Sequence, residues 1–187
     1  MPRAVDVEQR RWQIVLALWA VIYRQGIEAV TYQAVAQEAQ ISVGRVQHYF
    51  TSKRELVLAG CQAILALAAR DHDPTAQPDP YQALVDILVQ PIPRDEGFRR
   101  GSAVWYAYLT RAMVDPQIGA IVTEASQGTL AEVTRLLRRT GLAAQPARAQ
   151  AARLIALSNG LAQHTLLGVV DADEAVRLLN EEVERLR

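Results

Sequence analysis

Three signals for the start of a helix fall within the 26 residues from Thr31 to Leu56, and they constrain the fold more than any other feature. Thr31 and Ser42 each precede a short segment with helical apolar spacing, as N-cap residues do. Ser52 and Glu55 have the S-x-x-E spacing of a capping box. Such closely spaced starts predict two short helices and the beginning of a third, joined by tight turns.

Apolar residues recur at helical spacing along the rest of the chain as well, and no alternating strand pattern is visible. The first helix carries Ile14, Leu18 and Ile22 on one face and is expected to end at Gly26. Further helices are expected over 81–89 and 98–114, after Asp115-Pro116, from Pro146 to Gly168, and after Asp171. The sequence therefore predicts an all-α protein of about nine helices. Three prolines within residues 71–80 favour a linker there.

The second of the two short helices carries a dense row of groups that suit the reading of DNA. Val46 faces inward, which leaves Val43, Gly44, Arg45, Gln47 and His48 at the outer surface. Arginine can bind guanine and glutamine can bind adenine through two hydrogen bonds each. Side chains on either side of this row are placed to hold phosphates and to fix the register: Thr31, Ser42, Tyr49 and Lys53. A solvated polar face is the alternative interpretation.

Residues 10–60 resemble the DNA-binding domain of the tetracycline-repressor (TetR) family of bacterial regulators. The resemblance rests on Thr31, on the pair Val35-Ala36, on the turn Gln40-Ile41-Ser42, and on QHYFTSKREL at residues 47–56. Gln40 stands where the family's turn usually has glycine, Arg45 where Thr or Ser is common, and Gln47 where Tyr is common. Because the last two belong to the groove-facing surface, no relative supplies the operator sequence.

The resemblance implies a DNA-binding domain over residues 1–52 and a ligand-binding and dimerisation domain over 53–187, connected by the helix 53–70. It also implies a homodimer that places two reading helices in successive major grooves of a palindromic operator. Two C-terminal helices would supply the pairing face. The candidate interface residues recur at helical spacing, and they could equally be core: Leu154, Ser158, Leu161, Thr165, Leu178, Leu179 and Val183.

Family members usually bind a small molecule in the C-terminal domain and then leave DNA, so the resemblance implies an unidentified effector. The C-terminal stretch is most similar to the choline-operon-type repressors of the family. Six aromatic, sulfur-containing or polar residues are candidates for the pocket, with plain core packing as the alternative: Trp105, Tyr108, Met113, Asn159, Gln163 and His164. Asn159 and Gln163 share one helical face and could point together into an apolar cavity.

Other function classes find little support in the sequence. The three histidines, His48, His72 and His164, are far apart and do not have the spacing of metal ligands. We find neither a glycine-rich phosphate loop nor a nucleophile elbow, so we expect neither an enzyme nor a cofactor. The one cysteine, Cys61, excludes an internal disulfide. A ligand-independent architectural DNA-binding protein of the same fold remains the alternative function.

Charge and hydropathy fit a cytoplasmic regulator. The net charge is zero, but residues 1–60 carry seven Lys or Arg and five Asp or Glu, whereas residues 61–187 carry 13 and 15. This mild asymmetry permits a DNA-facing N-terminal end. No apolar run approaches the roughly 20 residues of a membrane span, and the N-terminus lacks the apolar core of a signal peptide. We therefore expect a soluble protein without a membrane partner.

Overall fold

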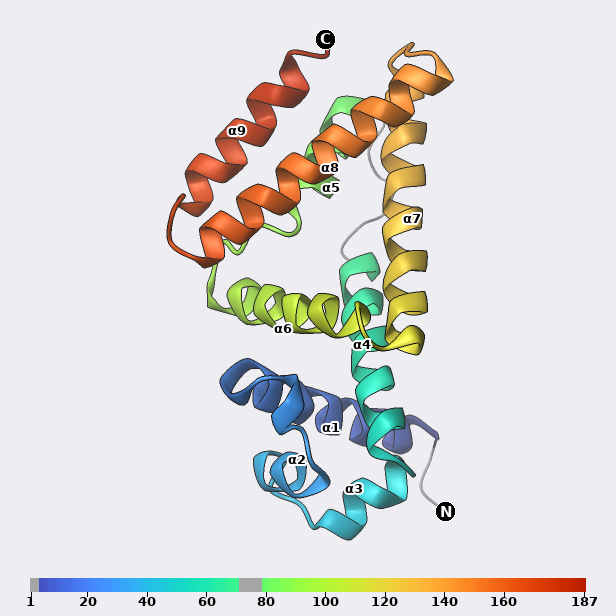
Figure 1. The fold of residues 1–187 in the computed structure, drawn as a ribbon, viewed down its shortest axis with the longest axis vertical. Helices are drawn as coiled ribbons and strands as arrows, with labels where there is room; N and C mark the ends of the chain where they lie inside the picture. Colours follow the sequence, from blue (N-terminus) through green and yellow to red (C-terminus); the bar gives the residue numbers. More distant parts are fainter. Residues whose placement is uncertain (1–3, 71–78) are drawn as a thin grey trace. The chain divides into compact units, whose positions relative to one another are not determined.

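A computed structural model of the protein describes residues 4–70 and 79–187, and over these residues the chain is helical, without strands. The predicted all-α class is confirmed (Figure 1). The described residues form nine α-helices and one short 3-10 helix, in this order: α1 (Ala4–Gln25), η1 (Ile27–Ala29), α2 (Tyr32–Glu38), α3 (Val43–Tyr49), α4 (Lys53–Arg70), α5 (Pro80–Val89), α6 (Glu96–Ala112), α7 (Pro116–Arg139), α8 (Ala144–Leu166) and α9 (Ala172–Glu184).

The chain divides into two compact units. The first comprises the described residues up to Ala66 together with Ala103–Val122, and the second those of Leu67–Ser102 and Thr123–Arg187. The functional division at residues 52 and 53 is a separate matter and stays a prediction. Most of the proline-rich segment expected as a linker lies outside the described residues. Its last two residues begin α5, with Asp79 as the N-cap and Pro80 at the first helical position.

In the first unit, α2, the tight turn that follows it and α3 form a helix-turn-helix that rests on a buried apolar core. Helix α2 contacts both α1 and α3. The buried side chains that join these helices come from each of them in turn: Leu18 and Ile22 from α1, Val35 from α2, and Val46 from α3. Leu18, Ile22 and Val46 lie on the faces that the sequence assigned to the core.

Helix α4 approaches its neighbours in the first unit closely at Gly60. The indole Nε1 of Trp19 donates to the carbonyl oxygen of Gly60 at 3.2 Å. A Cβ at this position would clash with the hydroxyl of Tyr108 and with a methyl group of Leu18. Burial raises the pKa of the adjacent Cys61 to about 11, which keeps this thiol protonated and inert.

The second unit packs α5, α8 and α9 together with the C-terminal part of α7. Figure 1 shows α8 and α9 running side by side, and α5 contacts both helices. The buried residues at the centre are aliphatic and include Leu88 of α5, Leu137 of α7, Leu154 of α8 and Leu179 of α9.

The helix ends follow the capping signals of the sequence. The side chains of Thr31 and Ser42 accept hydrogen bonds from the backbone N–H groups three residues on, at 3.0 and 3.2 Å. Asp171 caps α9 in the same way. Helix α8 differs from the prediction, because it begins at Ala144, two residues before Pro146. Proline in a first turn costs no hydrogen bond, since the N–H groups there have no partner within the helix.

Candidate nucleic-acid interface

Helix α3 presents the row of side chains that the sequence placed on the reading surface. Val46 is completely buried and anchors the helix against the core. Val43, Arg45, Gln47 and His48 are exposed. The side chain of Arg45 forms no hydrogen bond or ion pair with the rest of the described chain, so its donors are available to an external ligand.

The position of Gly44 on α3 is also open. A Cβ built at Gly44 would meet no other atom within 4 Å. Packing inside the protein therefore does not require glycine here. The absence of a side chain lowers the profile of the exposed face and lets the backbone approach a ligand closely.

The turn between α2 and α3 accommodates Gln40 in a left-handed conformation, with φ at 55°. It is the one non-glycine residue with positive φ in the described ranges 4–70 and 79–187. The N–H group of Ile41 then donates to the carbonyl of Ala36 at 3.0 Å, which closes the turn. A glutamine thus serves where the family usually has glycine, at a cost of about 1–2 kcal/mol for the left-handed backbone.

The expected phosphate-binding groups flank α3 on both sides. Thr31 and Ser42 are exposed N-cap residues of α2 and α3. Tyr49 is half-buried at the end of α3, with its ring edge-on to that of His48 at 5.1 Å between centroids. Lys53 is exposed at the first position of α4, and its ammonium group has no hydrogen bond or ion pair within the described part of the chain. These groups border the reading surface as predicted, although their binding of phosphate stays a prediction.

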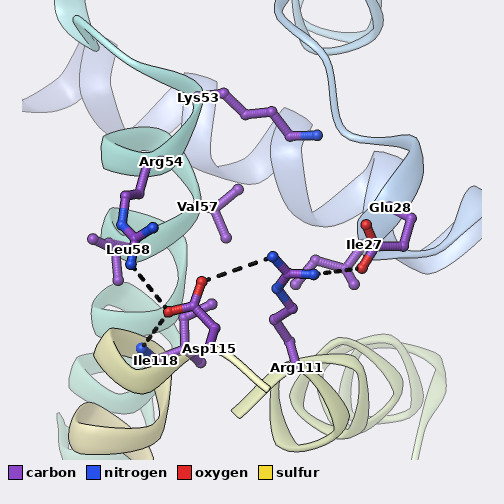
Figure 2. Close-up of a pocket in the computed structure, with 9 residues that line it drawn as sticks. All are labelled: Ile27, Glu28, Lys53, Arg54, Val57, Leu58, Arg111, Asp115 and Ile118. Atoms are coloured by element: carbon purple, nitrogen blue, oxygen red, sulfur yellow. Dashed lines mark hydrogen bonds and ion pairs between the residues drawn. The ribbon is translucent and has the colours of Figure 1, made fainter. Parts of the chain in front are cut away.

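A charged cavity of about 290 Å³ lies in the same compact unit, beside the start of α4. Its apolar lining consists of Ile27, Val57, Leu58 and Ile118, and its polar lining of Glu28, Lys53, Arg54, Arg111 and Asp115. Figure 2 shows Arg111 between two carboxylates, that of Glu28 at 2.9 Å and that of Asp115 at 3.8 Å. Arg54 reaches the other oxygen of Asp115 at 3.3 Å (Figure 2). One chain of ion pairs therefore links η1, α4 and the turn between α6 and α7.

Asp115 is the centre of this chain and also the N-cap of α7. Its carboxylate accepts from the N–H groups of Gln117 at 3.1 Å and Ile118 at 3.4 Å. Burial raises the pKa of Asp115, but these two N–H groups and the guanidinium groups of Arg54 and Arg111 outweigh burial. The pKa of the carboxyl therefore lies below its ordinary value of 3.8. The Asp-Pro pair revealed the cap in the sequence, whereas nothing local in the sequence indicates the two arginines.

The six candidate effector residues do not come from one compact unit. Trp105, Tyr108 and Met113 belong to the first unit, and Asn159, Gln163 and His164 to the second. Tyr108 is fully buried and donates to the carbonyl of Val57 at 3.1 Å, whereas Met113 is 84% exposed beyond the end of α6. Trp105 is half-buried. The three residues of α8 are exposed, although the sequence suggested that Asn159 and Gln163 face a cavity.

The candidate dimer residues lie mostly inside the core of the subunit. Six of the seven are buried, and they are Leu154, Ser158, Leu161, Thr165, Leu179 and Val183; Leu178 is half-buried. The hydroxyl of Ser158 donates to the carbonyl of Leu88 in α5 at 2.6 Å. These side chains are thus already covered by α5 and by each other. The opposite face of α8 is exposed and includes Ala152, Ala156 and Leu157.

No helix in the described ranges is long and apolar enough to cross a membrane. The same residues contain no group of three or more His, Cys, Asp or Glu that could hold a metal ion.

Comparisons with known proteins agree over the whole chain. Residues 14–59 match the family of bacterial regulatory proteins of the tetR type, and residues 80–187 match the C-terminal domain of BetI-type transcriptional repressors. The HTH-type transcriptional regulator PksA of Bacillus subtilis is 29% identical over 192 residues, which cover all of this chain and 94% of PksA. The regulator BetI of Burkholderia lata is 28% identical over 195 residues, covering all of this chain and 98% of BetI.

Solved structures share the fold. A transcriptional regulator from Saccharomonospora viridis in complex with choline superposes with a TM-score of 0.85 at 24% identity, over 95% of this chain and 96% of that one. A regulator from Rhodococcus has a TM-score of 0.84 at 23% identity, over 94% and 95% of the two chains. The predicted resemblance is confirmed. The chain belongs to the TetR family of bacterial transcriptional regulators, with a BetI-type C-terminal domain, and is a DNA-binding protein and not an enzyme.

Proposed function

We propose that this regulator works as a homodimer that inserts α3 of each subunit into the major groove of a palindromic operator and is released by a small-molecule effector. The observation that carries the proposal is the exposed face of α3, on which a free arginine and an amide stand beside a buried valine anchor. Polar side chains that are neither buried nor paired within the protein suit an external partner with many hydrogen-bonding groups.

The groups on and around α3 divide into readers and clamps. Arg45 would bind guanine, Gln47 adenine, and Val43 the methyl group of thymine, with His48 beside them. Thr31, Ser42, Tyr49 and Lys53 would bind phosphates and fix the register on the duplex. Gly44 would allow close approach to the groove.

The homodimer would form through the exposed face of α8, with a contribution from α9. Ala152, Ala156 and Gly160 follow one another at helical spacing on this face, and Leu157 is 38% exposed beside them. Small side chains allow two helices to approach closely, and an exposed leucine gains from burial by a partner. This face differs from the one that apolar periodicity first suggested, because that face is occupied by the core.

The effector would be a small organic molecule bound in the C-terminal region. Choline is the first compound to test, because a structural relative was solved in complex with it. A quaternary ammonium group binds to the faces of aromatic rings, and α6 carries a half-buried Trp105. Within the first unit, Tyr108 and Met113 stay candidate effector contacts beside Trp105. Asn159, Gln163 and His164 belong to the second unit and stay separate candidates for contacts to a polar group of an effector.

Selection of bound duplexes from a random pool would test the proposal. We expect an inverted repeat whose half-sites are centred about one helical turn, roughly 34–36 Å, apart. Enrichment of unrelated sequences, or of a single half-site, would contradict dimeric recognition. Addition of choline to the complex should then lower its affinity for the selected duplex. Release by no small molecule in a wider screen would favour the architectural alternative.

A further inference from the structure

The recognition helix α3 is too short to hold its own orientation. It has seven residues, and isolated helices of this length are unstable in water. Its last carbonyl groups also have no partner within the helix. The contacts at its C-terminal end therefore determine how rigidly α3 and its exposed face are held in one orientation.

Two long side chains, one from α1 and one from α2, donate hydrogen bonds to the carbonyl groups at that end. A guanidinium N–H of Arg11 donates to the carbonyl of Tyr49. The hydroxyl of Tyr32 donates to the carbonyl of Phe50 at 2.9 Å. Burial, and after it the carboxylate of Glu55, raises the pKa of Tyr32, so this hydroxyl keeps its proton for the bond.

Arg11 makes two further contacts at the same junction. Its guanidinium carbon lies 4.2 Å from the centroid of the Phe50 ring, and Phe50 is completely buried. Its second terminal nitrogen lies 3.4 Å from Glu55 in the first turn of α4. A positive charge at the C-terminal end of a helix also interacts favourably with the helix dipole.

Glu55 also contacts the segment between α3 and α4. One of its oxygens accepts from both the N–H and the hydroxyl of Thr51, each at 2.8 Å. Those bonds, followed by the contact with Arg11, outweigh partial burial and hold the pKa of Glu55 below its ordinary value. Arg11 thus binds the end of α3, the ring at its C-cap and the start of α4 at once.

We propose that Arg11 is a positioning residue for DNA recognition, which fixes the junction of α3 and α4 and so aims the reading face without contacting DNA itself. The proposal rests on the use of α3 as the reading helix. Its neighbour Arg10 provides a matched control, because Arg10 has the same charge, is exposed on α1, and has a hydrogen bond at 2.9 Å with Gln13 of the same helix.

The first test measures binding of the full-length protein to a duplex selected by the wild type and to random DNA, over a range of salt concentrations. Arg11→Ala should weaken binding to the selected duplex about tenfold or more and lower the ratio of specific to random binding. The slope of log affinity against log salt should stay unchanged. Arg11→Lys should not restore affinity, because an ammonium group cannot stack and bridge as a guanidinium does. Arg10→Ala should keep the ratio of the wild type.

A lower salt slope in Arg11→Ala, by about one for each subunit, together with rescue by lysine, would identify Arg11 as a phosphate contact and overturn the proposal. So would an unchanged ratio of specific to random binding in Arg11→Ala.

The second test needs no DNA and compares amide hydrogen exchange in the wild type, Arg11→Lys and Arg11→Ala. We expect faster exchange over residues 46–51 in both variants, with unchanged exchange over residues 35–38 of α2. Faster exchange throughout α1, α2 and α3 would mean that Arg11 contributes only general stability, and unchanged exchange would mean that it positions nothing. Either result rejects the proposal. If the wild type selects no duplex, the proposed function fails, but this measurement still decides the role of Arg11.

Discussion

Arg54, in the first turn of α4, and Asp115, the N-cap of α7, form an ion pair at 3.3 Å although 61 residues separate them in the sequence. Through Arg111 the same carboxylate is connected to Glu28 in η1. Asp115 therefore begins α7 and also joins α7 to α4, the helix that follows α3.

Substitution of Asp115 should separate these two tasks. Asp115→Asn keeps a helix cap but loses both ion pairs, whereas Asp115→Ala loses the cap and both ion pairs. The melting temperature should therefore fall in the order wild type, Asn variant, Ala variant. Because the pKa of Asp115 is lowered on folding, its stabilisation is complete well above pH 3.8 and is lost as the pH falls below 3.8. Melting temperatures between pH 7 and pH 3 should therefore fall less steeply for the Asn variant. Parallel curves would show that the charge of Asp115 does not contribute to stability.

Arg45→Ala should relax the base preference at one position of each half-site. The arginine is exposed and unpaired on α3, so its loss should cost roughly 1–3 kcal/mol of binding free energy at the preferred base and little elsewhere. Competition between duplexes that differ at one base pair would measure this. If discrimination at every position equalled that of the wild type, Arg45 would not be a base-reading residue.

Lys53→Ala should weaken binding to all sequences alike. An ammonium group that neutralises a phosphate releases a counterion, so the salt slope should fall by about 0.9 for each phosphate that is no longer neutralised. Lys53→Arg keeps the charge and should keep the slope. A decrease in affinity confined to the selected duplex would instead give Lys53 a part in reading bases.

Leu157→Glu should dissociate the proposed dimer while each subunit stays folded, because this side chain lies on the exposed face of α8. Leu161→Glu is a different case, since Leu161 is only 7% exposed and an unpaired buried charge costs several kcal/mol. The second variant should therefore lose its fold. Light scattering and circular dichroism would separate the two outcomes, and a Leu157→Glu protein that remained a dimer would rule out this face.

Gly60→Ala should destabilise the first unit by about 1–3 kcal/mol, because the added methyl group meets the Tyr108 hydroxyl and the Leu18 side chain. Tyr108→Phe removes that hydroxyl and its bond to Val57, at a cost of about 0.5–1.5 kcal/mol. The double variant should lose less unfolding free energy than the two single variants lose together, because removal of the Tyr108 hydroxyl partly relieves the clash. Additive free energies of unfolding, measured with urea, would contradict the close packing at Gly60.

Local signals in the sequence were sufficient for the helices and for the exposed face of α3. Thr31, Ser42 and Asp171 act within three residues of themselves, so their capping bonds follow from spacing alone. Val46 was assigned to the core because one face of a short helix must be buried. The positive φ of Gln40 was foreseeable only from the family pattern, in which glycine is usual there.

Contacts between distant segments were not predictable in this way. Arg11 and Tyr49 are 38 residues apart, and no periodicity relates them. Apolar spacing on α8 correctly marked a buried face, but burial by a partner subunit and burial by α5 leave the same pattern. For that reason the sequence leaves Leu154 and Leu161 open between a dimer interface and the core, while the exposed alanines on the other face of α8 give no comparable signal.

The shortness of α3 limits the information that one subunit can extract from a genome. Seven helical residues extend over about 10 Å, which corresponds to roughly three base-pair steps along the groove. A given sequence of three base pairs recurs by chance about every 64 base pairs. A single copy of α3 therefore cannot select one site among some millions of competing sites. Two such half-sites at a fixed separation occur by chance with the square of the frequency of one. Contacts to the flanking bases would have to provide the specificity that is still missing. The selectivity of this regulator for DNA would thus depend as much on the distance between the two half-sites as on their base sequence.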